Sequence, residues 1–217
     1  MIPLRSTERT YSTPVVVISL IIANLIIFFY ELRMGSYQLD RFIALHGIVP
    51  DRLHWSSLIT SMFLHGGWLH VLGNMWFLWI YGRNVEDLMG SGRFFTLYMA
   101  CGLAAGLIHI FFNPYSRVPT VGASGAIAGV MGAYLIKFPR ARIITLVPLF
   151  IFFTTLEIPA AFLLLYWFAI QFFSGVGSIG YSQASAGGVA WFAHIGGFVA
   201  GMLLVNAIGS SRRGWDW

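Results

Sequence analysis

Three short motifs place a serine, histidines and an asparagine in apolar surroundings. The first, Gly-Ala-Ser-Gly, spans Gly122 to Gly125, and Pro114 and Pro119 prevent a helix from starting before it. We therefore expect Ser124 at a helix N-terminus, where free N–H groups and the helix dipole can stabilise a developing negative charge. Taken alone, the pattern is more typical of a serine that only caps a helix, with Gly122, Gly125 and Gly129 as a packing stripe. This motif alone therefore does not identify a nucleophile.

The second motif places His194 at the head of a stripe of small residues. Gly197 and Gly201 follow at i+3 and i+7, on the same helical face. The segment after Ser124 carries a matching stripe, formed by Gly125, Gly129 and Gly132. Facing stripes of this kind let two helices approach closely, which would bring His194 towards Ser124. A histidine within a membrane marks a candidate functional site, although a serine–histidine contact could also merely join two helices.

The third motif contains His70 and Asn74, one turn apart on one helical face. They offer an imidazole N–H and an amide N–H to the interior. We expect His65 to precede this helix and to cap or orient the loop before it. Hydrogen bonding between helices and haem ligation remain open as other roles. For haem, His65 and His70 would be poor partners, because they would point about 140° apart if both were helical.

Together these residues supply a nucleophile, a base and an oxyanion hole, which is the set that serine catalysis requires. The sequence has no His-Glu-x-x-His motif for zinc. It also has no Asp or Glu within the apolar segments that carry Cys101, Ser124 and His194, so it has no water-activating pair there. We therefore expect neither a metal nor another cofactor.

The composition identifies a membrane protein. The chain has 217 residues, of which 58% are hydrophobic, 17% aromatic and only 10% charged, whereas soluble domains carry about 25% charged residues. This excludes a secreted disulfide scaffold, a disordered chain and a nucleic-acid binder. The thirteen Lys and Arg residues are spread through loops and tails, and the single Cys101 is expected to be a packing residue.

Six apolar segments predict an all-α, polytopic six-helix bundle. They are Pro14 to Tyr30, Leu69 to Tyr81, Phe94 to Phe112, Ala123 to Ile136, Pro159 to Phe173 and Ala190 to Ile208. Only the third and sixth approach the roughly 20 residues of a full span. Shorter helices end inside the bilayer, where irregular backbone persists only beside protein or water. We expect one membrane domain over residues 1–217, with no separate soluble domain.

The basic residues predict the topology. With six spans, nine Lys and Arg residues fall on one side, including Arg212 and Arg213, and four on the other. Both termini are therefore expected in the cytoplasm. The long stretch from Glu31 to Gly67 is expected to lie in the outer interface and to carry function. We interpret Ile143 to Thr155 as an interfacial cytoplasmic loop, and the alternative is one long kinked helix from Val147 to Phe173.

With these motifs in this order, the chain resembles the rhomboid family of intramembrane serine proteases from about Trp55 to Leu204. The family's His-x-x-x-Asn matches His70 and Asn74, and its Gly-x-Ser-Gly matches Gly122 to Gly125. Its Ala-His-x-x-Gly-x-x-x-Gly matches Ala193 to Gly201. Gly82 to Glu86 looks like the family's Gly-x-x-x-Glu, a structural feature at the cytoplasmic end.

The resemblance implies a Ser124–His194 dyad without a third acid, in a multi-pass protein of the cell (inner) membrane. The Ser124 N–H, Asn74 and His70 would hold the oxyanion, and Gly122 belongs to the same substrate-binding set. The substrates would be transmembrane segments of other membrane proteins in the lipid bilayer, with no nucleic acid involved. They would enter near the fifth helix, past a gate of bulky residues, namely Trp167, Phe168, Phe172 and Phe173.

Two positions depart from the family pattern. Well-described bacterial members carry an aromatic residue four positions after the serine, where it stacks on the histidine, but this chain has Ala128. Another side chain must then orient His194, and an aromatic residue at position 128 is expected to be tolerated. Many members also have Arg after the loop tryptophan, where this chain has Ser56 after Trp55. Neither change affects the reacting atoms.

Two other classes of function are weighed against the protease. A noncatalytic member of the family that binds and escorts membrane proteins would lose the serine or the histidine, and both are present. A secondary transporter would show paired repeats, and we find none in the sequence.

Overall fold

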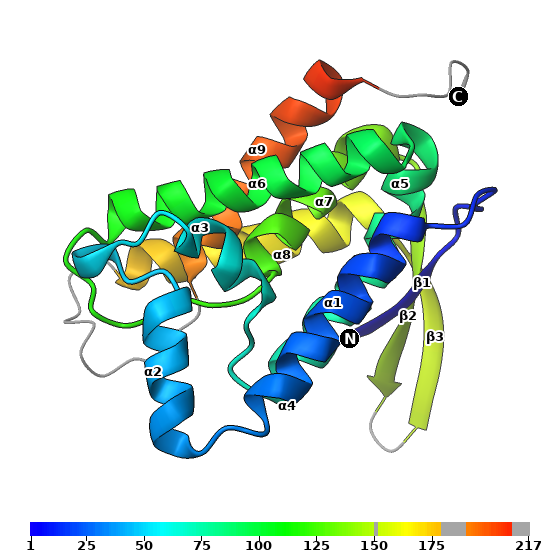
Figure 1. Ribbon diagram of the computed structural model, residues 1–217. Helices are drawn as coiled ribbons and strands as arrows, with labels where there is room; N and C mark the ends of the chain where they lie inside the picture. Colours follow the sequence, from blue (N-terminus) through cyan, green and yellow to red (C-terminus); the bar gives the residue numbers. More distant parts are fainter. Residues whose placement is uncertain (150–151, 179–189, 210–217) are drawn as a thin grey trace.

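The computed structural model describes residues 1–149, 152–178 and 190–209, which form a helical bundle with a small sheet beside it (Figure 1). The main helices are α1 (Val15–Glu31), α4 (Trp68–Phe77), α5 (Arg83–Met89), α6 (Ser91–Phe112), α7 (Ser124–Lys137), α8 (Ala160–Ser178) and α9 (Trp191–Ile208). A π-helical turn, η3 (Leu78–Gly82), joins α4 to α5. Each apolar segment expected from the sequence is thus helical.

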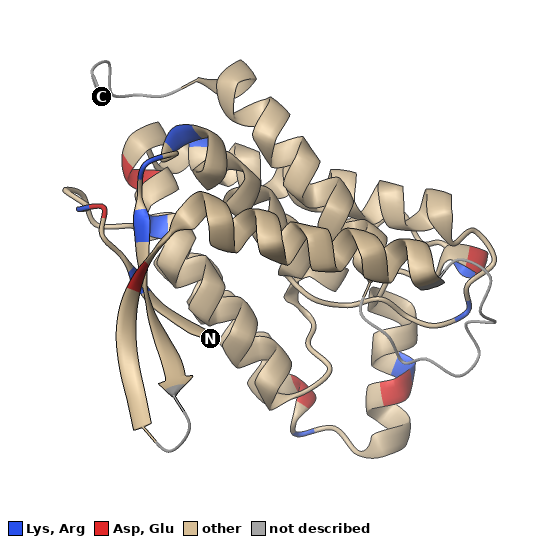
Figure 2. Cartoon of the chain, turned by 180° about the vertical axis from the view of Figure 1, so that it is seen from behind, with Lys and Arg blue, Asp and Glu red and all other residues tan. Residues whose placement is uncertain are grey.

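Three of the described helices, α6, α8 and α9, are long and apolar enough to cross a membrane, while α1 and α7 are shorter apolar helices. Figure 2 shows the charged residues gathered towards the ends of the long helices, with an uncharged middle between them. This distribution is that of a multi-pass membrane protein. Arg212 and Arg213, which contribute to the predicted topology, lie outside the described residues.

Helix α7 forms the centre of the bundle and packs against both α6 and α9. Its contact with α9 is backbone to backbone. A Cβ atom added at Gly197 would lie 2.0 Å from the carbonyl oxygen of Gly125, and one at Gly201 would lie 1.8 Å from that of Gly129. Only glycine permits this approach. On the α6 side, the buried Cys101 packs against Gly129.

A buried carboxylate on α5 holds the start of α1. Glu86, on α5, is only 2% exposed, and its two oxygens accept the backbone N–H groups of Val16 and Val17 at 2.9 and 2.8 Å. The Ser91 hydroxyl donates to the same carboxylate at 2.6 Å. Glu86 thereby satisfies N–H groups that an isolated helix start would leave unpaired.

The expectation of an all-α protein is wrong, because three strands form an antiparallel sheet in the order β1-β2-β3. They are β1 (Ile2–Ser6), β2 (Arg142–Leu149) and β3 (Phe152–Pro159). Figure 1 shows the sheet beside the start of α1. The hydroxyl groups of Ser6 and Tyr134 lie 2.7 Å apart, which fastens the sheet to α7.

Both interpretations of the region between α7 and α8 are therefore wrong. The segment is neither an interfacial loop nor the start of a long helix, but a β-hairpin that ends where α8 begins. β-Branched and aromatic residues dominate both strands, and they favour a pleated surface over a helix. The partner strand β1 comes from the other end of the sequence, so the apolar character of the hairpin alone did not reveal its pairing.

The long stretch between α1 and α4 is folded rather than an irregular loop. It contains α2 (Ser36–His46), the 3₁₀ turn η1 (Pro50–Arg52), α3 (Ser57–Thr60) and the 3₁₀ turn η2 (Ser61–Phe63). Leu58 and Met62 are buried against α6, whereas Trp55 is 73% exposed. This region therefore packs onto the bundle at the end where α7 starts.

Candidate active site

Ser124 and His194 are joined by a hydrogen bond across the α7–α9 contact. Ser124 is the first residue of α7, and its Oγ lies 2.8 Å from Nε2 of His194, near the start of α9. The glycine contacts between these helices bring the two side chains into register. A hydroxyl whose proton can pass to an imidazole nitrogen at this distance is the arrangement of an activated nucleophile.

The other ring nitrogen of His194 contacts a residue that the sequence did not single out. Nδ1 lies 2.6 Å from the side-chain oxygen of Gln171, on α8. Trp167, one turn earlier on α8, packs against the imidazole with ring centroids 5.7 Å apart. Both contacts with the His194 ring come from α8.

His70 directs its Nε2 atom towards the loop before the serine. Its Nδ1 accepts the N–H of Gly66 at 3.4 Å, which leaves the ring proton of a neutral imidazole on Nε2. A Cβ atom at Gly122 would lie 2.7 Å from this Nε2, and Gly122 has a φ of +126°, a conformation that favours glycine. Gly122 therefore allows the imidazole to lie directly against the backbone near Ser124.

Asn74 lies beside His70 and is held by His65. The Asn74 Nδ2 and the His65 Nε2 are 3.0 Å apart, and His65 is 3% exposed. The Asn74 Nδ2 also lies 3.6 Å from the position of a Cβ at Gly122. An amide has two N–H donors, so one can bond His65 while the second faces the site. His65 thus orients Asn74, beyond the capping or loop-orienting role expected for it.

A cavity of about 660 Å³ connects these groups. Its lining includes Ser124, His194, His70, Asn74 and Trp167. Leu69 and Phe77 on α4 and Ile127 and Met131 on α7 supply apolar walls. The cavity is mostly apolar with a few convergent polar groups, as expected of a binding site for an apolar substrate.

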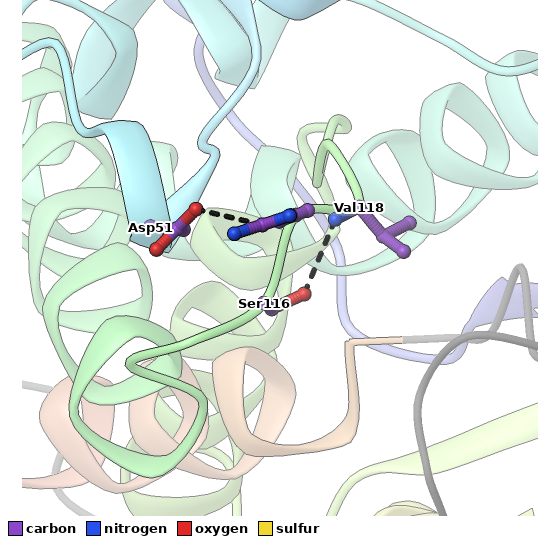
Figure 3. A network of polar contacts seen from close by, with 4 residues as sticks. Asp51, Ser116 and Val118 are labelled. Atoms are coloured by element: carbon purple, nitrogen blue, oxygen red, sulfur yellow. Dashed lines mark hydrogen bonds and ion pairs between the residues drawn. The ribbon is translucent and has the colours of Figure 1, made fainter.

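The segment that leads into α7 is fastened to the region between α1 and α4. Ile48 and Thr120 exchange backbone hydrogen bonds of 2.9 and 2.8 Å, and the N–H of Gly122 donates to the carbonyl of Ser61 at 2.8 Å. Nearer the surface, Arg117 pairs with Asp51 at 2.9 Å (Figure 3). These contacts fix the position at which α7, and with it Ser124, begins.

The structure thus brings Ser124, His194, His70 and Asn74 to one cavity, with Gly122 packed against His70 beside it. It brings Gly125, Gly129, Gly197 and Gly201 to one helix contact. Gln171 was missed. The signal available in the sequence was an amide inside the apolar run from Ala160 to Phe173, because an amide there needs a partner. Of the four residues expected at a gate, Trp167 lines the cavity, whereas Phe173 is 72% exposed.

The two histidines considered as haem ligands lie next to each other. His65 precedes α4, and its ring contacts that of His70 with centroids 5.1 Å apart and planes at 69°. The divergence of about 140° that two helical positions would give does not apply, because only His70 is helical. Each ring is engaged instead by a protein group, Asn74 for His65 and Gly66 for His70.

The Rhomboid domain family model matches residues 52–211, and the chain therefore belongs to the rhomboid family. This range contains Ser124, His194, His70, Asn74 and Gln171.

Curated relatives carry the same family name. The chain is 37% identical over 115 residues to Rhomboid protease GluP of Bacillus subtilis, covering 51% of the chain and 22% of GluP. It is 33% identical over 155 residues to Rhomboid protein 1, mitochondrial, of Saccharomyces cerevisiae, covering 68% of the chain and 40% of that protein. The chain is 29% identical over 143 residues to human Presenilin-associated rhomboid-like protein, mitochondrial, covering 63% of the chain and 36% of that protein. The match thus spans less than half the length of these relatives.

Proposed function

We propose that this protein is an intramembrane serine endopeptidase that hydrolyses peptide bonds in or next to transmembrane segments of other membrane proteins. The observation that carries the proposal is the 2.8 Å contact between Ser124 Oγ and His194 Nε2 at the N-terminus of α7. The similarity to Rhomboid protease GluP supports the same activity.

In the proposed mechanism Ser124 attacks the carbonyl carbon of the scissile bond. His194 accepts the Ser124 proton on Nε2 and then delivers it to the leaving amine, which gives an acyl-enzyme. The dyad has no carboxylate, so the imidazole must be oriented by neutral neighbours. Water then enters the cavity and attacks the ester carbonyl while His194 accepts its proton. His194 returns this proton to Ser124 Oγ as the ester bond breaks, and the acyl group leaves as a carboxylic acid.

The negative charge on the tetrahedral oxygen is stabilised by three donors in this mechanism. The N–H of Ser124 belongs to the first turn of α7, which has no intrahelical acceptor and lies at the positive end of the helix dipole. The Nε2–H of His70 and the second amide N–H of Asn74 lie beside Gly122, two residues before Ser124. Such preorganised donors act most strongly where water is excluded.

The membrane arrangement is part of the proposal. Six spans place both termini on the cytoplasmic side of the cell membrane, because the side richer in Lys and Arg stays inside. Residues 1–217 form one domain, and the cavity opens towards the outer half of the bilayer, since Ser124 starts a helix whose last residue, Lys137, belongs to the basic side. Substrates are membrane proteins, and no cofactor takes part.

The test is cleavage of a model transmembrane substrate by purified variants. We expect Ser124→Ala and His194→Ala each to abolish cleavage while leaving the melting temperature in detergent nearly unchanged. The double variant should be no worse, because members of one catalytic unit are strongly non-additive. Thr96→Ala, which removes an exposed hydroxyl on α6, is the matched control and should cleave normally. Cleavage that survives Ser124→Ala would contradict the proposal.

A further inference from the structure

A buried amide on α8 contacts the imidazole of the dyad. Gln171 is 5% exposed and His194 is 9% exposed, and the Oε1 atom of Gln171 lies 2.6 Å from Nδ1 of His194. This is a short contact for a nitrogen and an oxygen, which usually lie about 2.7 to 3.2 Å apart in hydrogen bonds. This hydrogen bond joins α8 to α9 at the histidine that contacts Ser124.

We propose that Gln171 is a positioning residue for His194, holding the imidazole in the tautomer and orientation in which Nε2 can accept the Ser124 proton. The proposal rests on the serine protease activity proposed above. It assigns to a neutral amide the orienting part that an acid performs in a Ser-His-Asp triad.

The chemistry of the two contacts determines which nitrogen carries the proton. A neutral imidazole has one N–H donor and one acceptor nitrogen, and an amide oxygen can only accept. The contact with Gln171 therefore requires the proton on Nδ1, which leaves the lone pair of Nε2 directed at the Ser124 hydroxyl 2.8 Å away. In the other tautomer, Nε2 could not act as a base, and two lone pairs would face each other at Nδ1.

The plane of the His194 ring is also restrained by a residue of α8. Trp167 packs against the imidazole from α8 at a centroid distance of 5.7 Å, with the planes 37° apart. Trp167 in turn packs against Phe198 on α9, with centroids 6.0 Å apart. Two neighbouring turns of α8 therefore restrain His194, one by a hydrogen bond and one by ring packing. Ala128, with its single methyl group, can provide neither contact.

The position of Gln171 also argues against a purely structural amide. Burying an amide in an apolar helix is unfavourable unless its polar atoms are paired. Here the oxygen is paired with the one side chain that must be held in a defined tautomer for the reaction. Among the described residues, the other titratable groups close enough to influence His194 are two imidazoles, those of His70 and His109. Changing the charge of residue 171 should therefore have a clear effect on the dyad.

The first test compares Gln171→Leu and Gln171→Glu with the control Leu165→Ala, which changes an exposed side chain of the same helix. Gln171→Leu should lower kcat by about tenfold and leave KM within about twofold, the scale of one lost neutral hydrogen bond. Gln171→Glu should recover kcat at high pH, because a carboxylate accepts the same N–H. It should also move the acidic limb of the pH profile upward by about 1 to 3 pH units, because a nearby negative charge stabilises the imidazolium.

The second test reads the tautomer without relying on activity. In protein labelled with ¹⁵N at histidine, the His194 signals are assigned by their absence from a His194→Asn sample. We expect the Nδ1–H form in the wild type and a mixture of tautomers in Gln171→Leu. This measurement decides the matter even where a variant fails to fold, since the wild type alone must show the Nδ1–H form.

Several outcomes would overturn the inference: a wild-type imidazole protonated on Nε2, or a Gln171→Leu variant whose kcat and pH profile equal those of Leu165→Ala. An unchanged acidic limb in folded Gln171→Glu would overturn it as well. Failure of the proposed function looks different, because wild-type protein would then neither cleave a substrate nor react with a serine-directed probe at Ser124.

Discussion

Replacing Gly201 with alanine tests whether the α7–α9 contact sets the geometry of the dyad. The added Cβ would lie 1.8 Å from the carbonyl oxygen of Gly129 and 2.7 Å from its Cα. Both atoms belong to the backbone of α7, so no side-chain rotation relieves the overlap. The oxygen is about 1.6 Å short of an ordinary contact, which begins at about 3.4 Å. We expect α9 to move away from α7 by a distance of this order.

Such a displacement affects both stability and catalysis. Overpacking of this kind costs about 1 to 3 kcal/mol of unfolding free energy, which corresponds to a melting temperature lower by roughly 2 to 12 °C for a chain of this size. His194 lies two turns before Gly201 on the same helix, so its distance from Ser124 should grow. A misplacement of about 1 Å can cost about a hundredfold in rate, and we expect turnover to fall by about ten- to a hundredfold.

The assay measures thermal unfolding in detergent together with cleavage of a transmembrane substrate, normalised to folded protein. Gly92→Ala is the matched control, because Gly92 lies in a helix and a Cβ there meets nothing within 4 Å. It should be neutral or stabilising by up to about 1 kcal/mol, since alanine favours a helix over glycine. If Gly201→Ala behaved like Gly92→Ala in both measurements, the proposed role of this contact would be refuted.

Four further predictions concern the site and its support. Asn74→Ala should lower turnover per active site by about a hundred- to a thousandfold with little change in KM. Active sites are counted by titration with a serine-directed inhibitor, and unchanged turnover would remove Asn74 from the oxyanion hole. Glu86→Ala should lower the unfolding free energy by about 1 to 3 kcal/mol, because two backbone N–H groups of α1 lose their acceptor, and turnover of the folded fraction should be unchanged. An unchanged melting temperature would count against this role of Glu86 at the start of α1. Ala128→Phe should destabilise the fold by about 1 to 3 kcal/mol, since Ala128 is 1% exposed. A variant as stable as the wild type in the same melting assay would show that the bundle has room for a ring at position 128. Cleavage should rise with pH as His194 loses its proton, because a cationic imidazole cannot act as a base, and a profile of kcat/KM that lacks this acidic limb would argue against His194.

The helices and the residues of the cavity could be predicted because their signals are local. Apolar runs, the prolines before Ser124 and the glycine spacing after His194 each restrict the chain within a few turns. Pairing between distant segments leaves no such local mark. Strand β1 pairs with β2 about 140 residues later in the sequence, with Ile2 opposite Leu146. The only local signal for a strand was the set of β-branched residues in the hairpin.

The environment of His194 could be predicted only in part. The sequence showed that Ala128 cannot stack on the imidazole, but not which helix supplies a substitute. Gln171 and Trp167 reach it because α8 packs beside α9, a tertiary contact that periodicity does not specify. The tolerance expected for an aromatic residue at position 128 is untested, but the structure now predicts a destabilised variant, because Ala128 is buried in the core of the bundle.

The most direct test of the central claim is covalent labelling of the detergent-solubilised protein with a fluorophosphonate probe, followed by mass spectrometry of the modified peptide. An activated serine reacts with such a probe, whereas an ordinary hydroxyl does not. We predict a single adduct on Ser124 in the wild type, and its loss in His194→Ala, where Ser124 remains but its base is absent. Labelling that spared Ser124, or that was unchanged in His194→Ala, would contradict a serine–histidine dyad in this protein.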